Sequence, residues 1–78
     1  MAETIYIVRE LNVIEETDLS GMPTTIWACI GNSDDYSANG IKVAGPVPIL
    51  FADRMIDGLT VLLERLGHQV IVETTADD

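Results

Sequence analysis

The stretch from Ile49 to Val72 constrains the fold most, because it joins a long helical repeat to a run of strand-forming residues. Apolar side chains recur at steps of one, three and four residues, which places them on one side of a helix of about 3.6 residues per turn. Gly67 suits the left-handed conformation that ends many helices. The segment predicts an amphipathic helix, beginning between Val47 and Ala52, whose core side carries Ala52, Met55, Ile56, Leu59, Leu62, Leu63 and Leu66.

Three earlier segments have the composition of β-strands. Thr4–Ile14 has apolar residues on both faces, as in a central strand, although Arg9 interrupts one face. Pro23–Ile30 follows a polar turn, and Ile41–Ala44 follows a loop rich in Gly, Asn, Ser and Asp. Because proline cannot donate a backbone hydrogen bond, the two prolines in Gly45–Pro48 predict an extended connector rather than a continued strand.

These elements predict one α+β domain over residues 1–78, in the order β-β-β-α-β. One helix packs on one face of a small, mostly antiparallel sheet. The last strand, Gln69–Thr74, is expected to run parallel to the third strand or to the first. Residues 75–78 are expected to form a frayed acidic tail. Gly58 either lets the helix approach the sheet closely or is simply tolerated there.

The charge is strongly unbalanced, with 13 carboxylates against four Lys and Arg and a formal net charge of −9. Such a chain repels nucleic acid and is attracted to basic surfaces. Asp34 and Asp35 are expected at one end of the sheet, near Arg65 and His68. The strand directions gather the other acidic residues of interest at the opposite end, as an acidic pole: Glu15, Glu16, Asp18, Asp53, Glu73, Asp77 and Asp78. The pole either contacts a basic partner or is a solvated surface without a partner.

Trp27 and Cys29 alternate with Ile26, so the two sets lie on opposite faces of the second strand. One helix covers only one face. Trp27 therefore either packs under the helix or belongs to an exposed apolar patch that meets a partner or a second copy of the chain. Tyr36, in the polar loop, is expected to be exposed, and it either anchors an interface or is a loop residue without a partner.

No catalytic, phosphate-binding or calcium-binding motif is present, and His68 and Cys29 are each the only residue of their type. The chain is therefore expected to be neither an enzyme nor a binder of a metal or cofactor. The sequence has no signal-peptide pattern and no apolar run that could span a membrane. Together with the single cysteine, this predicts a cytoplasmic protein.

Over its whole length the chain resembles, in size, acidity and α+β pattern, the small acidic inhibitors that phages encode against bacterial defences, the anti-CRISPR proteins among them. The resemblance implies a non-catalytic inhibitor that occupies the basic, nucleic-acid-binding surface of a protein partner as a DNA mimic. The alternative is a small homo-oligomeric structural protein that uses an exposed apolar sheet face. Because they lie on predicted turns, the expected partner-binding residues are Glu15, Glu16, Asp18, Asp34 and Asp35, together with Tyr36.

Overall fold

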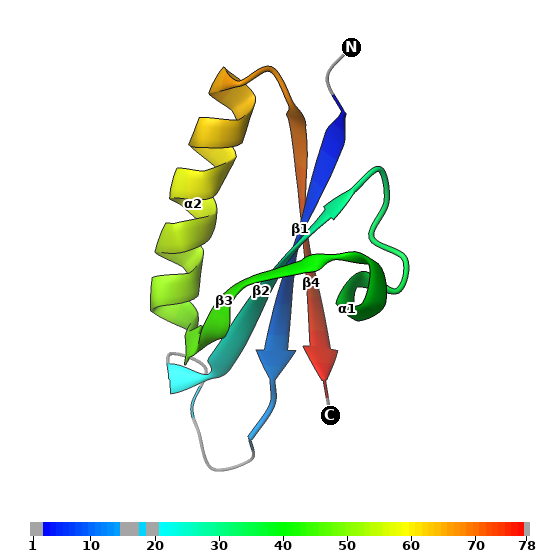
Figure 1. The fold of residues 1–78 in the computed structure, drawn as a ribbon. Helices are drawn as coiled ribbons and strands as arrows, with labels where there is room; N and C mark the ends of the chain where they lie inside the picture. The colour runs from blue at the N-terminus through cyan, green and yellow to red at the C-terminus, as the bar shows by residue number, and fades with distance from the viewer. Residues whose placement is uncertain (1–2, 15–17, 19–20, 78) are drawn as a thin grey trace.

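The computed structural model describes residues 3–14, 18 and 21–77. Within these residues, four strands form one mixed sheet in the order β3-β2-β1-β4, and a long helix packs on one face (Figure 1). The α+β class predicted from the sequence is therefore confirmed. The elements are β1 (Thr4–Asn12), β2 (Pro23–Ile30), α1 (Tyr36–Asn39), β3 (Ile41–Pro48), α2 (Ile49–Arg65) and β4 (Gln69–Asp77).

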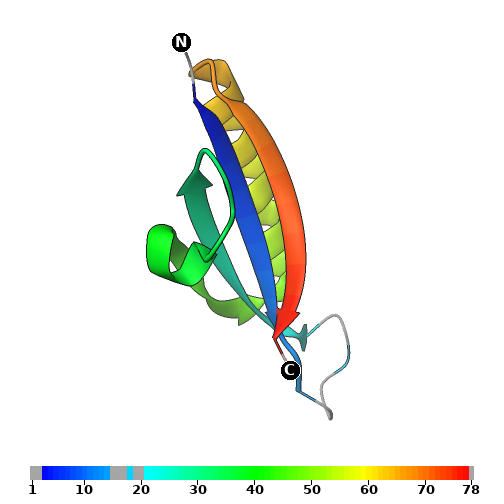
Figure 2. The same cartoon turned by 90° about the vertical axis from the view of Figure 1, so that its right-hand side faces the viewer.

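β1 is the centre of the sheet because it pairs with a neighbour on each edge. It runs antiparallel to β2 and parallel to β4, with Ile7 opposite Ala28 on one side and Val72 on the other. Figure 2 shows β1 and β4 side by side along their length. The sequence predicts that the last strand runs parallel to the third strand or to the first, and the first is its partner. The crossover through α2 carries the chain from one edge of the sheet to the other.

The core lies where α2 crosses β1 and β2. Ile7, Ile26, Ala52 and Ile56 are buried together, and five partly buried residues surround them: Ala44, Val47, Leu59, Leu63 and Val70. Burying side chains of this size contributes about 1.5–3 kcal/mol each, which is enough to hold a single helix on the sheet.

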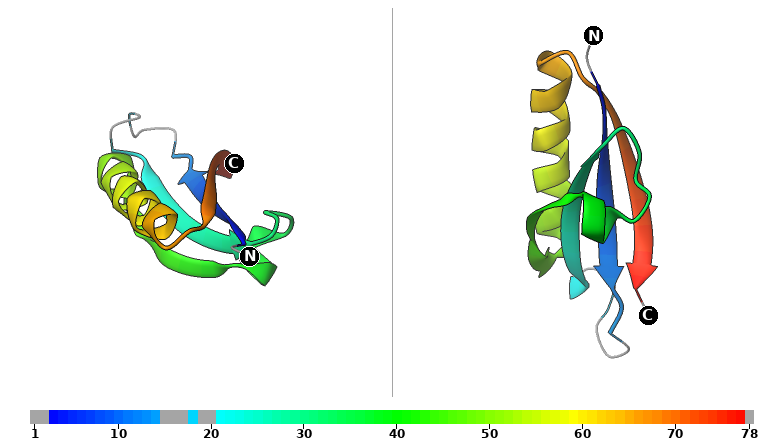
Figure 3. Two further views of the ribbon diagram at one scale, coloured as in Figure 1. Left: turned by 90° about the horizontal axis from the view of Figure 1, so that it is seen from above. Right: turned by 45° about the vertical axis from the view of Figure 1, so that its right-hand side comes forward.

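The apolar side of α2 is wider than the sheet that covers it. Met55, Leu62 and Leu66, expected in the core, are 42%, 55% and 66% exposed. The sheet twists strongly, as the view from above in Figure 3 shows, and it leaves this flank of the helix uncovered. The prediction that the whole apolar stripe is core is therefore wrong for these three residues.

The ends of three strands also differ from the prediction. β1 stops at Asn12 rather than Ile14. β3 continues through Pro48, because it is an edge strand whose pairing with β2 shifts register on both sides of Ile26, and such irregular edges accept proline. β4 continues to Asp77, paired with Asn12, so the frayed tail is not observed as far as Asp77. Asp78 lies outside the described residues.

The helix begins and ends close to the prediction. Pro48 precedes its first residue, and the backbone N–H of Ile49 donates to the carbonyl of Met22 at 3.0 Å. At the other end Gly67 has a φ of 95°, which confirms the left-handed C-terminal residue. His68 lies at that end, with its Nδ1 3.1 Å from the carbonyl oxygen of Glu3.

Two glycines should respond oppositely to alanine. A Cβ at Gly58, in α2, would meet nothing within 4 Å, so Gly58→Ala should raise the free energy of unfolding by about 1 kcal/mol through helix propensity. A Cβ at Gly40 would lie 2.6 Å from Cys29 Sγ and from the Tyr36 carbonyl oxygen. Gly40→Ala should therefore lower that free energy by about 1–3 kcal/mol. Urea unfolding measures both values, and changes of the same sign would contradict this packing.

Candidate functional site

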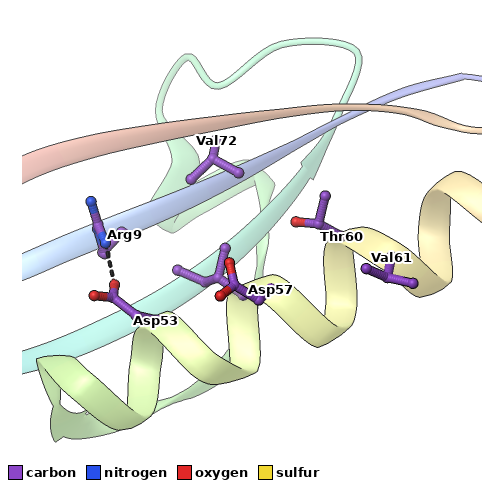
Figure 4. Close-up of a pocket in the computed structure, with 7 residues that line it drawn as sticks. Arg9, Asp53, Asp57, Thr60, Val61 and Val72 are labelled. Atoms are coloured by element: carbon purple, nitrogen blue, oxygen red, sulfur yellow. Dashed lines mark hydrogen bonds and ion pairs between the residues drawn. The ribbon is translucent and has the colours of Figure 1, made fainter.

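The candidate site is an open groove of about 580 Å³ between α2 and the β1–β4 pair, named here the α2–β4 groove (Figure 4). Asp53, Asp57 and Thr60 lie in line along α2 because they are three or four residues apart. Strand alternation places Arg9 and Val72 on the side of the sheet that faces the helix. Its lining residues are Arg9, Asp53, Ile56, Asp57, Thr60, Val61 and Val72.

Arg9 occupies one end of the groove and joins three elements. Its Nη1 donates to Asp53 Oδ1 in the first turns of α2, as the dashed line in Figure 4 marks. Its Nη2 and Nε donate to Thr74 Oγ1 on β4, at 3.0 and 3.2 Å. The side chains of Arg9 and Asp53 are 29% and 41% exposed, so water only partly screens their attraction. The positive charge of Arg9 is thereby matched within the chain.

Three other carboxylates of α2 and β4 have no such partner. Asp57 and Glu64 are exposed on α2, separated by two helical turns, and Glu73 is exposed on the face of β4 that points away from α2. Among the residues that the structure describes, the one ion pair is between Arg9 and Asp53. The negative charges of Asp57, Glu64 and Glu73 are therefore available to a cationic partner.

Thr60 adds an unusual polar atom. Its Oγ1 is buried and has no hydrogen-bond partner, although its residue lines the groove. A buried hydroxyl without a partner costs about 1–3 kcal/mol relative to a satisfied one. The groove therefore combines an apolar floor, exposed carboxylates nearby and one unsatisfied hydroxyl.

The carboxylates expected to bind a partner do not form one surface. Glu15 and Glu16 lie outside the described residues. Asp18 is exposed, and its Oδ1 accepts a hydrogen bond from the backbone N–H of Gly21 at 3.1 Å. Asp34 and Asp35 are exposed beyond the other end of β2, as expected, next to α1. Their roles in binding stay predictions.

Tyr36 is half-buried, so the expectation of an exposed loop aromatic is wrong. Its ring centroid lies 5.8 Å from that of Trp27, and its hydroxyl donates to Glu10 Oε2. Trp27 Nε1 donates to the other oxygen of the same carboxylate at 3.2 Å. These contacts hold α1 against the face of the sheet opposite α2. The apolar patch considered for that face is thus partly covered, and Val8 there is only 3% exposed.

Cys29 lies beneath α1 on this second face and is only 2% exposed. Burial raises the pKa of the Cys29 thiol above its ordinary value of 9.0, and the negative charge of Glu73 raises it further. The thiol is therefore protonated near neutral pH and is not an activated nucleophile.

A second apolar surface, named here the α2–β3 flank, lies on the other side of the helix. Phe51, Met55 and Leu62 are 58%, 42% and 55% exposed there, and Val43 of β3 is 43% exposed. Val43, Met55 and Leu62 border a shallow groove of about 400 Å³ that also includes Arg54 and Gly58 and no carboxylate. An exposed apolar surface of α2 therefore lies beside β3.

One signal in the sequence pointed to the α2–β4 groove. Arg9 falls among apolar residues on one face of its strand, and a cation on a core-facing position requires an anionic partner. The partner, Asp53, is 44 residues away, and Thr74 is 65 residues away. Strand and helix patterns do not specify contacts over such separations.

Comparison with protein-family models, with curated proteins and with solved structures finds no match for this chain. Among the described residues, no group of three or more His, Cys, Asp or Glu is placed to hold a metal ion. No helix in the described part of the chain is long and apolar enough to cross a membrane.

Proposed function

We propose that this chain is a non-catalytic acidic protein that binds the basic surface of a protein partner. The observation that carries the proposal is a set of three exposed carboxylates that no cation of the described chain neutralises: Asp57 in the α2–β4 groove, Glu64 two turns further along α2, and Glu73 on the opposite face of β4. A net charge of −9 adds a long-range attraction that speeds encounter with a basic surface.

The groove favours binding over chemistry. Thr60 carries its only hydroxyl, and histidine, cysteine and lysine are absent from the residues that line it. Asp53 accepts a hydrogen bond from Arg9, so its carboxylate is already engaged within the chain. What the groove offers a partner is negative charge beside an apolar floor.

The partner class follows from the same charges. A protein surface that binds nucleic acid presents Lys and Arg side chains to phosphates, and exposed carboxylates satisfy the same cations. We therefore propose inhibition by occupying such a surface, as in the anti-CRISPR type of protein. The negative charges of the chain would then compete with a nucleic acid for one set of basic residues.

A competition assay tests this function. The probe is an arginine-rich peptide bound to a short fluorescent DNA duplex, and the measurement is the concentration of the protein that releases half of the duplex. The Asp57→Asn, Glu64→Gln, Glu73→Gln triple variant should raise that concentration about tenfold at low salt, since each exposed pair contributes up to about 1 kcal/mol.

The comparison variant is the Asp18→Asn, Asp34→Asn, Asp35→Asn triple, which removes three charges from the exposed turn positions that the sequence suggested as partner contacts. If the carboxylates of α2 and β4 make the contact, this variant should change the concentration less than about threefold, because only the general attraction is weakened. Equal losses in the two variants would show that net charge alone acts. No displacement by the unaltered protein would contradict the proposed function.

The α2–β3 flank supports a second candidate, self-association. Two copies with a net charge of −9 repel each other, but carboxylates are absent from the residues that line the groove of this flank. In a dimer through this flank, the apolar side chains of α2 from the two copies would meet without carboxylates of one copy facing those of the other. The second candidate is a homodimer through this flank, in place of the sheet face that the sequence suggested.

Light scattering tests the homodimer. Leu62→Asp places a charge in the flank at a side chain that is already 55% exposed, so it should convert a dimer to a monomer without unfolding it. Val61→Asp is the matched control, because Val61 is similarly exposed but lines the α2–β4 groove. A monomer for the unaltered chain at high concentration would rule this candidate out.

A further inference from the structure

In the described part of the chain, no strand pairs with the outer edge of β4. β4 pairs with β1 from Gln69 to Asp77 without a register shift, and it is the last strand of the described sheet. Figure 2 shows it as the outermost strand on that side. Alternate backbone N–H and C=O groups of an edge strand point away from the sheet, so β4 presents a row of them to solvent.

The two edges of the sheet differ in how they are protected. β3, at the opposite edge, contains Lys42, Pro46 and Pro48 and has two register shifts, all of which hinder pairing with another strand. β4 contains no proline, glycine, lysine or arginine, and its pairing is regular. β4 is therefore the edge that accepts an added strand.

The surroundings of this edge define what an added strand would meet. On the side facing α2, Val72 is 43% exposed and borders the α2–β4 groove, with Asp57 and Val61 across from it (Figure 4). On the other side of β4, Glu73 is exposed. Because side chains of a strand alternate between faces, one set would enter the groove and the other would lie beside Glu73.

A second copy of β4 fits this edge poorly. Antiparallel pairing of two β4 strands would bring together Glu73 and the neighbouring helix carboxylates of both copies, and like charges that face each other are destabilising. A segment that alternates Lys or Arg with small apolar residues would place its basic side chains beside Glu73 and its apolar side chains against Val61 and Val72 of the groove. Charge complementarity thus selects a basic segment over a second copy.

We propose that the free edge of β4 binds an extended, basic segment of the partner protein as an added strand. The main chain of the segment would pair with β4, and its alternate side chains would reach the α2–β4 groove and Glu73. This inference rests on the proposed function, because it specifies how the basic partner is held. It is the β-strand addition mode of peptide recognition.

Hydrogen exchange on the intact protein tests the proposal. The probe is a short peptide that alternates Lys and Val. The comparison peptide has the same sequence with every backbone amide N-methylated, so it keeps the charge of the probe but has no backbone N–H groups to donate. With saturating Lys-Val peptide, exchange of the outward-facing amides of Gln69–Asp77 should slow about tenfold or more. Amides of Ile41–Pro48, at the other edge, should be unchanged.

The N-methylated peptide should bind about tenfold more weakly, since it cannot pair as a strand. Salt-dependent binding of both peptides with equal affinity, and with unchanged exchange in β4, would overturn strand addition while the proposed function stands. No binding of either peptide would contradict both proposals. Slowed exchange in β4 that grows with protein concentration, without peptide, would show that a second copy occupies the edge and would also overturn the inference.

Discussion

The position of Arg9 on the helix-facing side of the central strand is the constraint on which the candidate site depends. A cation between a helix and a sheet must be matched, and Asp53 of α2 and Thr74 of β4 supply the partners. On the β2 side of this cluster, Ile7, Ile26, Ala52 and Ile56 close the space between helix and sheet. On the β4 side, polar side chains replace that packing, and the α2–β4 groove remains open.

The distribution of charge follows from the same arrangement. Arg9 neutralises Asp53, which leaves Asp57, Glu64 and Glu73 as the unmatched carboxylates along the β4 side of the molecule. Arg54 lies by the α2–β3 flank, where carboxylates are absent from the groove lining. The helix thus separates an acidic, polar side of the molecule from an apolar side that carries a positive charge. The acidic side suits a basic partner, and the apolar side suits another apolar surface.

Local patterns in the sequence predict much of the fold. Alternation and spacing predict the boundaries of β2, the helical repeat and the left-handed Gly67. The geometry of crossovers predicts a parallel last strand and leaves two neighbours open, of which the structure has β1. The positions where β3 and β4 end cannot be predicted in this way, because pairing with the neighbouring strand determines them. β4 extends as far as Asp77 because that position pairs with Asn12 of β1, although both residues are polar. β3 extends to Pro48 because its irregular pairing with β2 accommodates Pro46 and Pro48.

The candidate site was less predictable than the fold. Turns identify exposed carboxylates such as Asp18 and Asp34, but exposure alone does not show which charges are already matched. Tyr36 looked like a free loop aromatic, yet its contacts with Trp27 and Glu10 lie across the sheet. The groove depends on contacts between residues far apart in the chain, which no local pattern specifies.

A double-mutant cycle on Arg9 and Asp53 tests the central claim most directly. The free energy of unfolding is measured by urea for the unaltered chain, Arg9→Met, Asp53→Asn and the double variant. If Asp53 matches the charge of Arg9 between helix and sheet, the two substitutions should be coupled by about 1–2 kcal/mol, as for a partly buried charged hydrogen bond. Effects that add to within about 0.3 kcal/mol would show that Asp53 does not match Arg9 and would contradict the account.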